Sequence, residues 1–191
     1  MSNKSFRLQI LPIPLILAVF ISCEQAENLT SERLVFSVET SDPAIGSYNA
    51  ARDEYNISTG GGAFFSATEK ELLSDSAFVP QGLRIIINLP GAAELIEVLL
   101  NPNGYRVKTQ IELAGGDIII NHTNQAYPVI NPEGDTLYAV RGEGIVSGGS
   151  DLFKNISGLF YEKSTYRIWN FTGSGPDSME IGCRYELFVD F

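Results

Sequence analysis

The chain has 191 residues, and 13 Lys and Arg stand against 23 Asp and Glu, which gives a formal net charge of −10 at pH 7. A chain this acidic repels, over its surface as a whole, the nucleic-acid backbone and anionic lipid surfaces, so we discount both as partners. Two cysteines and one histidine provide neither a zinc-type ligand set nor a Cys/His nucleophile pair, so we expect no metal and no cofactor and assign no catalytic residue.

The N-terminus has the layout of a bacterial lipoprotein signal peptide. Lys4 and Arg7 precede an apolar run over residues 8–21, which is shorter than the roughly 20 apolar residues of a membrane-spanning helix. The end of this run, Val19-Phe-Ile-Ser-Cys23, resembles a lipobox, in which the cysteine is diacylated and becomes the new N-terminus. The sequence therefore predicts a cleaved signal peptide over residues 1–22 and lipidation of Cys23. The alternative is an ordinary signal peptide with a chance cysteine.

Residues 23–32 are polar and aperiodic, which is typical of a tether between a lipid and a folded domain. Cleavage leaves 11 basic and 23 acidic residues, a net charge of −12, so membrane association would come from the lipid. Acidic residues directly after Cys23 resemble the surface-export signal of some bacterial lipoproteins. We expect an outer-membrane lipoprotein of the cell envelope, facing the periplasm or the cell surface. Cys183 then has no disulfide partner and is expected to be a buried, inert thiol.

Beyond the tether, β-forming segments alternate with Gly, Pro, Asn and Asp turns. The predicted strands cover residues 33–38, 63–68, 83–89, 105–113, 117–122, 137–147, 159–171 and 179–191. Residues 40–61 are predicted as loop because of Pro43, Gly46 and three glycines at 60–62, and residues 92–100 as either a strand or one short helix. No βαβ alternation is present, so the sequence predicts one all-β domain over residues 33–191, an antiparallel barrel or sandwich.

A glycine-rich stretch over residues 140–158 resembles the hairpin of the dirigent and allene oxide cyclase barrel superfamily. The matching positions are Gly142, Gly144, Gly148, Gly149, Phe153 and Gly158. Ser150-Asp151 replaces the usual third turn glycine, and the strand over residues 182–191 is similar to the closing strand of those barrels. The resemblance covers about residues 105–191. It implies a single small antiparallel β-barrel and, since related barrels assemble as trimers, self-association.

We expect these glycines to shape the strands and the hairpin of the barrel rather than to take part in chemistry. Gly142 and Gly144 share one strand face, where a missing side chain lets the strand bend or a neighbour approach closely. Gly148-Gly149 is expected to supply positive φ for a tight hairpin, and Phe153 to fold over the end of the barrel as an apolar plug.

The resemblance implies two activities, cyclisation of an unstable epoxide fatty acid and stereocontrol of radical coupling. The acting residues of neither family can be placed on this chain. Our leading expectation is therefore a non-catalytic binding or interaction module of the cell envelope, with a small apolar ligand in the barrel. The alternative is a cyclase- or isomerase-like or dirigent-like enzyme that acts on a hydrophobic small molecule in the lumen.

The candidate ligand-binding residues lie on two neighbouring predicted strands: Arg141 and Glu143 on one, and Tyr161, Arg167 and Trp169 on the next. Arg141 and Glu143 are two apart and share a face. If that face lines the lumen they would anchor a ligand, and if it faces water they belong to a cross-strand charge network. The aromatic pair is either a ligand-stacking stripe or packing.

Two further polar groups are assigned by the faces of their strands. Alternate residues from Ile181 to Phe191 form the core face of the last strand, so Arg184, Glu186 and Asp190 are predicted to face outwards. His122 shares a face with Ile118 and Ile120 and is predicted to be a hydrogen-bonded core or rim residue rather than a ligand.

Overall fold

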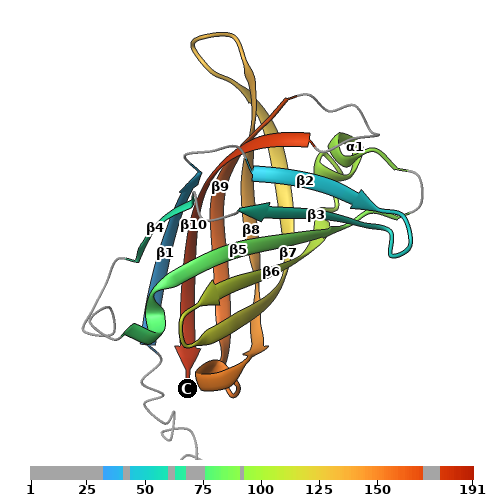
Figure 1. Cartoon of the computed structure of the whole chain (residues 1–191). Helices are drawn as coiled ribbons and strands as arrows, with labels where there is room; N and C mark the ends of the chain where they lie inside the picture. Colours follow the sequence, from blue (N-terminus) through green and yellow to red (C-terminus); the bar gives the residue numbers. More distant parts are fainter. Residues whose placement is uncertain (1–31, 41–43, 60–62, 68–75, 91–92, 170–176) are drawn as a thin grey trace, which may run out of the picture. The chain divides into compact units, whose positions relative to one another are not determined.

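The computed structural model describes residues 32–40, 44–59, 63–67, 76–90, 93–169 and 177–191 (Figure 1). Within these ranges it describes the side chains of all residues except 32, 38–40, 63–67, 169 and 177. The predicted signal peptide, Cys23 and the tether up to residue 31 lie outside the described residues, so these assignments stay predictions.

The described chain is all-β and forms one antiparallel sheet. Its strands are β1 (Glu32–Thr40), β2 (Ala44–Asn49), β3 (Glu54–Thr59), β4 (Ala63–Ala67), β5 (Pro80–Asn88), β6 (Tyr105–Leu113), β7 (Gly116–Ile130), β8 (Thr136–Gly149), β9 (Ser157–Trp169) and β10 (Asp177–Asp190). Three short helices accompany them: η2 (Ser76–Phe78), α1 (Leu95–Leu99) and η3 (Asp151–Phe153).

The sheet closes on itself in a ring. The strands are hydrogen-bonded in the order β2-β3-β5-β6-β7-β8-β9-β10-β1-β4. The first three residues of β10 pair with β2, whereas residues 182–189 of the same strand pair with β1, and the pairing of β10 with β2 closes the ring (Figure 1). Closure satisfies backbone groups that an open edge would leave unpaired.

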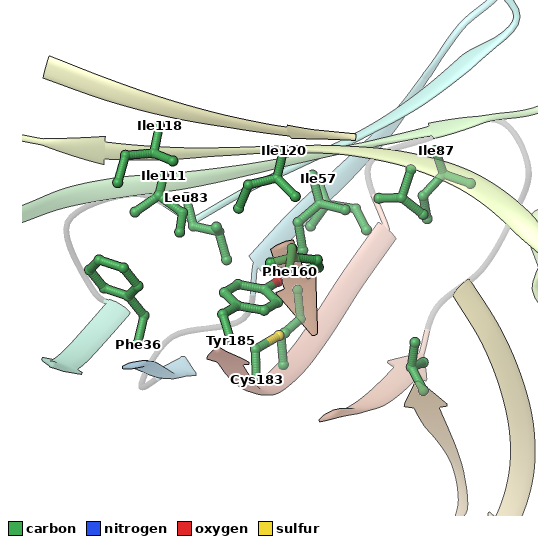
Figure 2. Close-up of a cluster of buried hydrophobic side chains, with 14 of the residues drawn as sticks. Phe36, Ile57, Leu83, Ile87, Ile111, Ile118, Ile120, Phe160, Cys183 and Tyr185 are labelled. Atoms are coloured by element: carbon green, nitrogen blue, oxygen red, sulfur yellow. The ribbon is translucent and has the colours of Figure 1, made fainter. Parts of the chain in front are cut away.

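Strict alternation of side chains builds the core. In β6 the odd-numbered residues from Tyr105 to Leu113 are buried while Arg106 and Lys108 are exposed, because successive side chains point to opposite faces. Figure 2 shows isoleucines of β3, β6 and β7 facing Phe36 and Phe160 from the other side of the ring. Each such fully buried side chain contributes about 1.5–3 kcal/mol.

The prediction of a loop over residues 40–61 is wrong, because β2 and β3 form a hairpin within this range. Gly46, one of the residues on which the loop prediction rests, lies in β2 beneath the ring of Tyr55, where a Cβ would meet the tyrosine side chain. Inward-facing Ala44, Tyr55 and Ile57 are buried in the core. The glycine therefore makes room for an aromatic ring rather than breaking the strand.

The remaining predicted strands are confirmed over the described residues, with longer bounds for several, whereas positions 68, 170 and 171 lie outside the described residues. Residues 95–99 form the short helix of the two alternatives offered for residues 92–100. Leu95, Val98 and Leu99 of α1 are buried in the core. The segment from β8 to β9 differs from the predicted tight hairpin. Gly148 has a φ of 125°, but it lies at a shift in the β7–β8 register, and the chain reaches β9 through η3.

Phe153 is buried where β8 passes into β9, as the plug prediction requires. Its ring lies 5.2 Å from that of Phe78 in an edge-on contact and 6.4 Å from that of Phe191. The three aromatic rings come from three distant parts of the sequence, so they fasten the η2 and η3 segments to the C-terminus.

Gly142 and Gly144 have the close neighbours that were predicted for them. A Cβ on Gly142 would collide with Oδ1 of Asn124 from β7 and lie 3.2 Å from Oε2 of Glu162 from β9. A Cβ on Gly144 would collide with the backbone and Cβ of His122. The two glycines therefore let side chains of β7 and β9 approach each other across the inner face of β8.

Gly142→Ala is expected to lower the free energy of unfolding by about 2 kcal/mol or more, because the new methyl group overpacks the ring and disturbs a buried hydrogen bond. Chemical denaturation measures the change. Gly182→Ala in β10 is the matched control, since a Cβ there meets no atom within 4 Å, and it should be neutral or slightly stabilising. Equal effects of the two substitutions would contradict the close-approach role of Gly142.

Candidate functional site

Six polar side chains are buried together inside the ring, and we call them the interior cluster. They are Thr109, His122, Asn124, Glu162, Ser164 and Tyr166. They come from β6, β7 and β9, and the glycines of β8 let them meet. The side chain of Glu162 is 1% exposed, so the interior cluster contains a buried ionisable group. Such a group needs hydrogen-bond partners to stay charged there.

A directed chain of hydrogen bonds links Thr109 to Glu162. Asn124 Nδ2 donates to Glu162 Oε2 at 2.8 Å, which leaves Asn124 Oδ1 to accept from His122 Nδ1 at 2.6 Å. His122 Nε2 lies 2.8 Å from Thr109 Oγ1 and accepts a hydrogen bond from that hydroxyl. This pattern assigns the proton of a neutral imidazole to Nδ1, since an amide oxygen cannot donate.

Glu162 is the acceptor on which the interior cluster converges. Ser164 Oγ donates to its Oε1 at 2.6 Å and Tyr166 OH donates to the same oxygen at 3.1 Å. Asn124 Nδ2 donates to Oε2. Hydrogen bonds to an ionised acceptor are roughly twice as strong as those between neutral groups. Three donors therefore offset much of the cost of burying this carboxylate.

Burial sets the protonation of the neighbouring groups. It lowers the pKa of His122 below its ordinary value, against the opposing effects of the Glu162 charge and the Asn124 hydrogen bond. It raises the pKa of the Cys183 thiol, and Glu162 raises it further. The predicted burial of Cys183 is confirmed, as is the hydrogen-bonded core position of His122, whereas the inertness of the thiol stays a prediction.

Two buried tyrosine hydroxyls beside the interior cluster take no part in its hydrogen bonds. Tyr105 and Tyr185 are 4% and 0% exposed, and neither hydroxyl makes a hydrogen bond of ordinary geometry to the described residues. Each hydroxyl has a polar neighbour, Asn124 for Tyr105 and Cys183 for Tyr185, so the two tyrosines border the interior cluster.

The outer face of β7–β10 contains the second candidate site. Arg141, Glu143 and Tyr161 point outwards and are exposed, so the alternative in which Arg141 and Glu143 line the lumen does not hold. With Lys163 and Arg184 they surround a hollow of about 550 Å³, which we call the outer hollow. The outward directions predicted for the charges of the last strand are confirmed.

The other two predicted ligand residues lie elsewhere. Arg167 donates from Nη2 to Asp135 Oδ2 at 2.6 Å and lies 3.6 Å from Glu180 Oε2, so it ties the β7–β8 hairpin to β9 and β10. Trp169 ends β9 opposite Ser178, and its side chain lies outside the described residues, so its stacking role stays a prediction.

Sequence reasoning missed most of the interior cluster. Glu162 and Ser164 share the face of Phe160 and Tyr166 in β9, and Asn124 continues the face of Ile118, Ile120 and His122 in β7. The alternation of those strands was the available signal. Ionisable and amide side chains are ordinarily exposed, and that expectation outweighs the alternation in a reading of sequence alone.

Comparisons with protein-family models, with curated proteins and with solved structures find no match for this chain. Across the part of the chain that the structure describes, no helix is long and apolar enough to cross a bilayer. Within the same residues, no group of three or more His, Cys, Asp or Glu side chains is placed to hold a metal ion.

His122 is expected to titrate below about 6.5, its ordinary pKa. Because the unfolded chain then takes up a proton more readily than the folded one, stability should fall as the pH drops from about 7 through 6.5 towards the folded pKa. NMR of the only histidine in the chain measures the folded pKa directly. His122→Gln should flatten the pH dependence of the unfolding free energy in this window. Titration of His122 above 6.5 would contradict the assignment of a neutral, buried ring.

Proposed function

We propose that this protein is a lipid-anchored binding module of the cell envelope that recognises its partner on the outer face of β7–β10. The observation that carries the proposal is the outer hollow, where three of the five predicted ligand residues gather with Lys163 and Arg184. Convergent polar and aromatic side chains around a concave surface are the usual marks of a binding site.

The packing of the interior supports an outward-facing site. Large apolar side chains face one another across the ring (Figure 2), and the interior cluster satisfies its own hydrogen bonds. A second hollow of about 520 Å³, with Arg106 and Lys108 on its wall, also lies on the outer face, over β5–β8. Hydrogen bonding within the interior cluster leaves little of its polar capacity for a ligand.

The proposal includes the lipid anchor at Cys23 and the type of β-barrel that the sheet forms. The basic start, short apolar core and Cys23 support a diacylated outer-membrane lipoprotein, attached to the membrane by its lipid. The closed antiparallel ring and the glycine positions of β8 support a β-barrel of the allene oxide cyclase and dirigent type. Trimeric self-association, expected from that resemblance, is part of the proposal.

Site-specific photocrosslinking in the native membrane tests the proposed surface. Tyr161→p-benzoylphenylalanine should capture a partner molecule, because Tyr161 lies at the outer hollow and is 45% exposed. Tyr48→p-benzoylphenylalanine is the matched control, since Tyr48 is 44% exposed on β2 and lines neither hollow. No adduct at position 161, or the same adduct at both positions, would refute the proposed surface.

The second candidate is a cyclase- or isomerase-like or dirigent-like enzyme with its site inside the ring. Two observations favour it: Glu162 is a buried carboxylate that faces the interior, and the hydroxyls of Tyr105 and Tyr185, which lie beside Asn124 and Cys183, make no hydrogen bond of ordinary geometry to the described residues. Such hydroxyls could donate to a carbonyl or ether oxygen while Glu162 accepts a proton.

Tyr185→Phe separates the two functions. For a binding module with a filled interior, removing a buried hydroxyl that makes no hydrogen bond of ordinary geometry should leave the unfolding free energy equal or slightly higher and leave crosslinking at position 161 unchanged. Chemical denaturation and the crosslinking assay measure both. If a small molecule is extracted from the purified wild-type protein but not from Tyr185→Phe, the interior is the ligand site and the enzyme becomes the better account.

A further inference from the structure

Three cations lie in one line across the outer hollow. Arg141 of β8 is the register partner of Lys163 of β9, and Lys163 is the register partner of Arg184 of β10. Side chains that are directly opposite on neighbouring strands have Cβ atoms about 4.5–5.5 Å apart, and like charges at this spacing destabilise a sheet. In a chain with a net charge of −10, this row is a local concentration of positive charge.

Three acids, Glu143, Glu162 and Glu186, line the hollow with the cations, and none of them is paired with Arg141 or Lys163. The carboxylate of Glu162 is buried and is held by donors inside the ring. Glu186 is shared between Arg184, whose Nε lies 3.1 Å from it, and Arg33, whose Nη2 also lies 3.1 Å away. Glu143 belongs to the adjacent row, opposite Tyr161. Among the described residues, neither Arg141 nor Lys163 makes an ion pair within 4 Å. Two of the three cations are therefore available to an external anion.

An aromatic side chain flanks the cations. Tyr161 precedes Lys163 by two residues on the same face of β9, and its ring packs edge-on against Phe188 with centroids 6.1 Å apart and an interplanar angle of 82°. This contact fixes the tyrosine while 45% of its surface stays exposed. An exposed ring held in place beside cations offers an apolar platform next to an anion site.

We propose that the outer hollow binds an anionic saccharide. Arg141 and Lys163 would contact its carboxylate or sulfate groups, a sugar ring would lie on Tyr161, and Gln125 at the edge of the hollow would bond hydroxyls. The row crosses two strand spacings, roughly 10 Å, which suits an extended chain with several charges better than a single ion. The inference rests on the proposed function of this face.

The acidic net charge of the protein does not prevent such binding. Charges separated by more than about 8 Å at physiological ionic strength are largely screened, so the nearby cations dominate at the hollow itself. The same cations could bind a phosphate ion. A saccharide also needs Tyr161 for its sugar ring, whereas phosphate does not, so replacing Tyr161 distinguishes the two ligands.

Isothermal titration of the full-length protein in mild detergent tests the inference, with hexagalacturonate as the anionic probe and maltohexaose as the neutral one. We expect hexagalacturonate to bind and maltohexaose not to bind measurably. Lys163→Gln should weaken binding by about tenfold, the usual effect of one charge-assisted contact. Glu143→Gln should tighten it, because an acid beside the anion is removed, and loss of folding cannot produce a gain in affinity.

Lys108→Gln, which makes the same change of charge at the second hollow, is the matched control and should leave the affinity unchanged. Tyr161→Ala should weaken hexagalacturonate binding but not the binding of inorganic phosphate. The inference fails if hexagalacturonate does not bind, if Lys163→Gln and Glu143→Gln leave its affinity unchanged, or if Tyr161→Ala has no effect on it. A protein captured by the crosslinker at position 161, with no saccharide binding, would overturn this inference and leave the proposed function standing.

Discussion

The hydrogen bond from Asn124 to Glu162 is the interaction on which the inside of this protein depends. It crosses β8 at Gly142, where any side chain would collide with it, and so joins β7 and β9 across the strand between them. A buried carboxylate without donors would cost several kcal/mol, whereas here Ser164, Tyr166 and Asn124 all donate to it. The buried carboxylate of Glu162 therefore depends on the Asn124 amide as a donor, and their hydrogen bond depends on the absence of a side chain at Gly142.

The same strands carry the outer hollow, because side chains alternate between faces. On β8 and β9 the inward residues Gly142 and Glu162 are flanked by outward residues that line the hollow, among them Arg141 and Lys163. A register shift of one residue would exchange the two faces. The buried hydrogen bond between β7 and β9 therefore also fixes the alignment of the cations outside.

Much of the fold could be predicted from local patterns. The alternation over residues 105–113 and the glycine and proline turns place most strands, whereas β2 and β3 were missed because Gly46 reads as a loop residue unless the Tyr55 ring above it is known. The pairing of β10 with both β1 and β2 joins distant segments that no local pattern connects. The site was predicted in part: Arg141, Glu143 and Tyr161 meet, but Lys163 and Arg184 join them only through the strand register.

Native mass spectrometry of the protein purified from its own membrane tests the central claim, an anchored module that binds on its charged outer face. Such a module should give a chain that begins at Cys23 and carries acyl mass, with a bound molecule that is released as the ionic strength rises from about 0.05 to 0.5 M, because exposed charges are screened at high salt. A chain without acyl mass would refute the lipid anchor, and a bound molecule that salt does not release would point to a ligand enclosed within the ring.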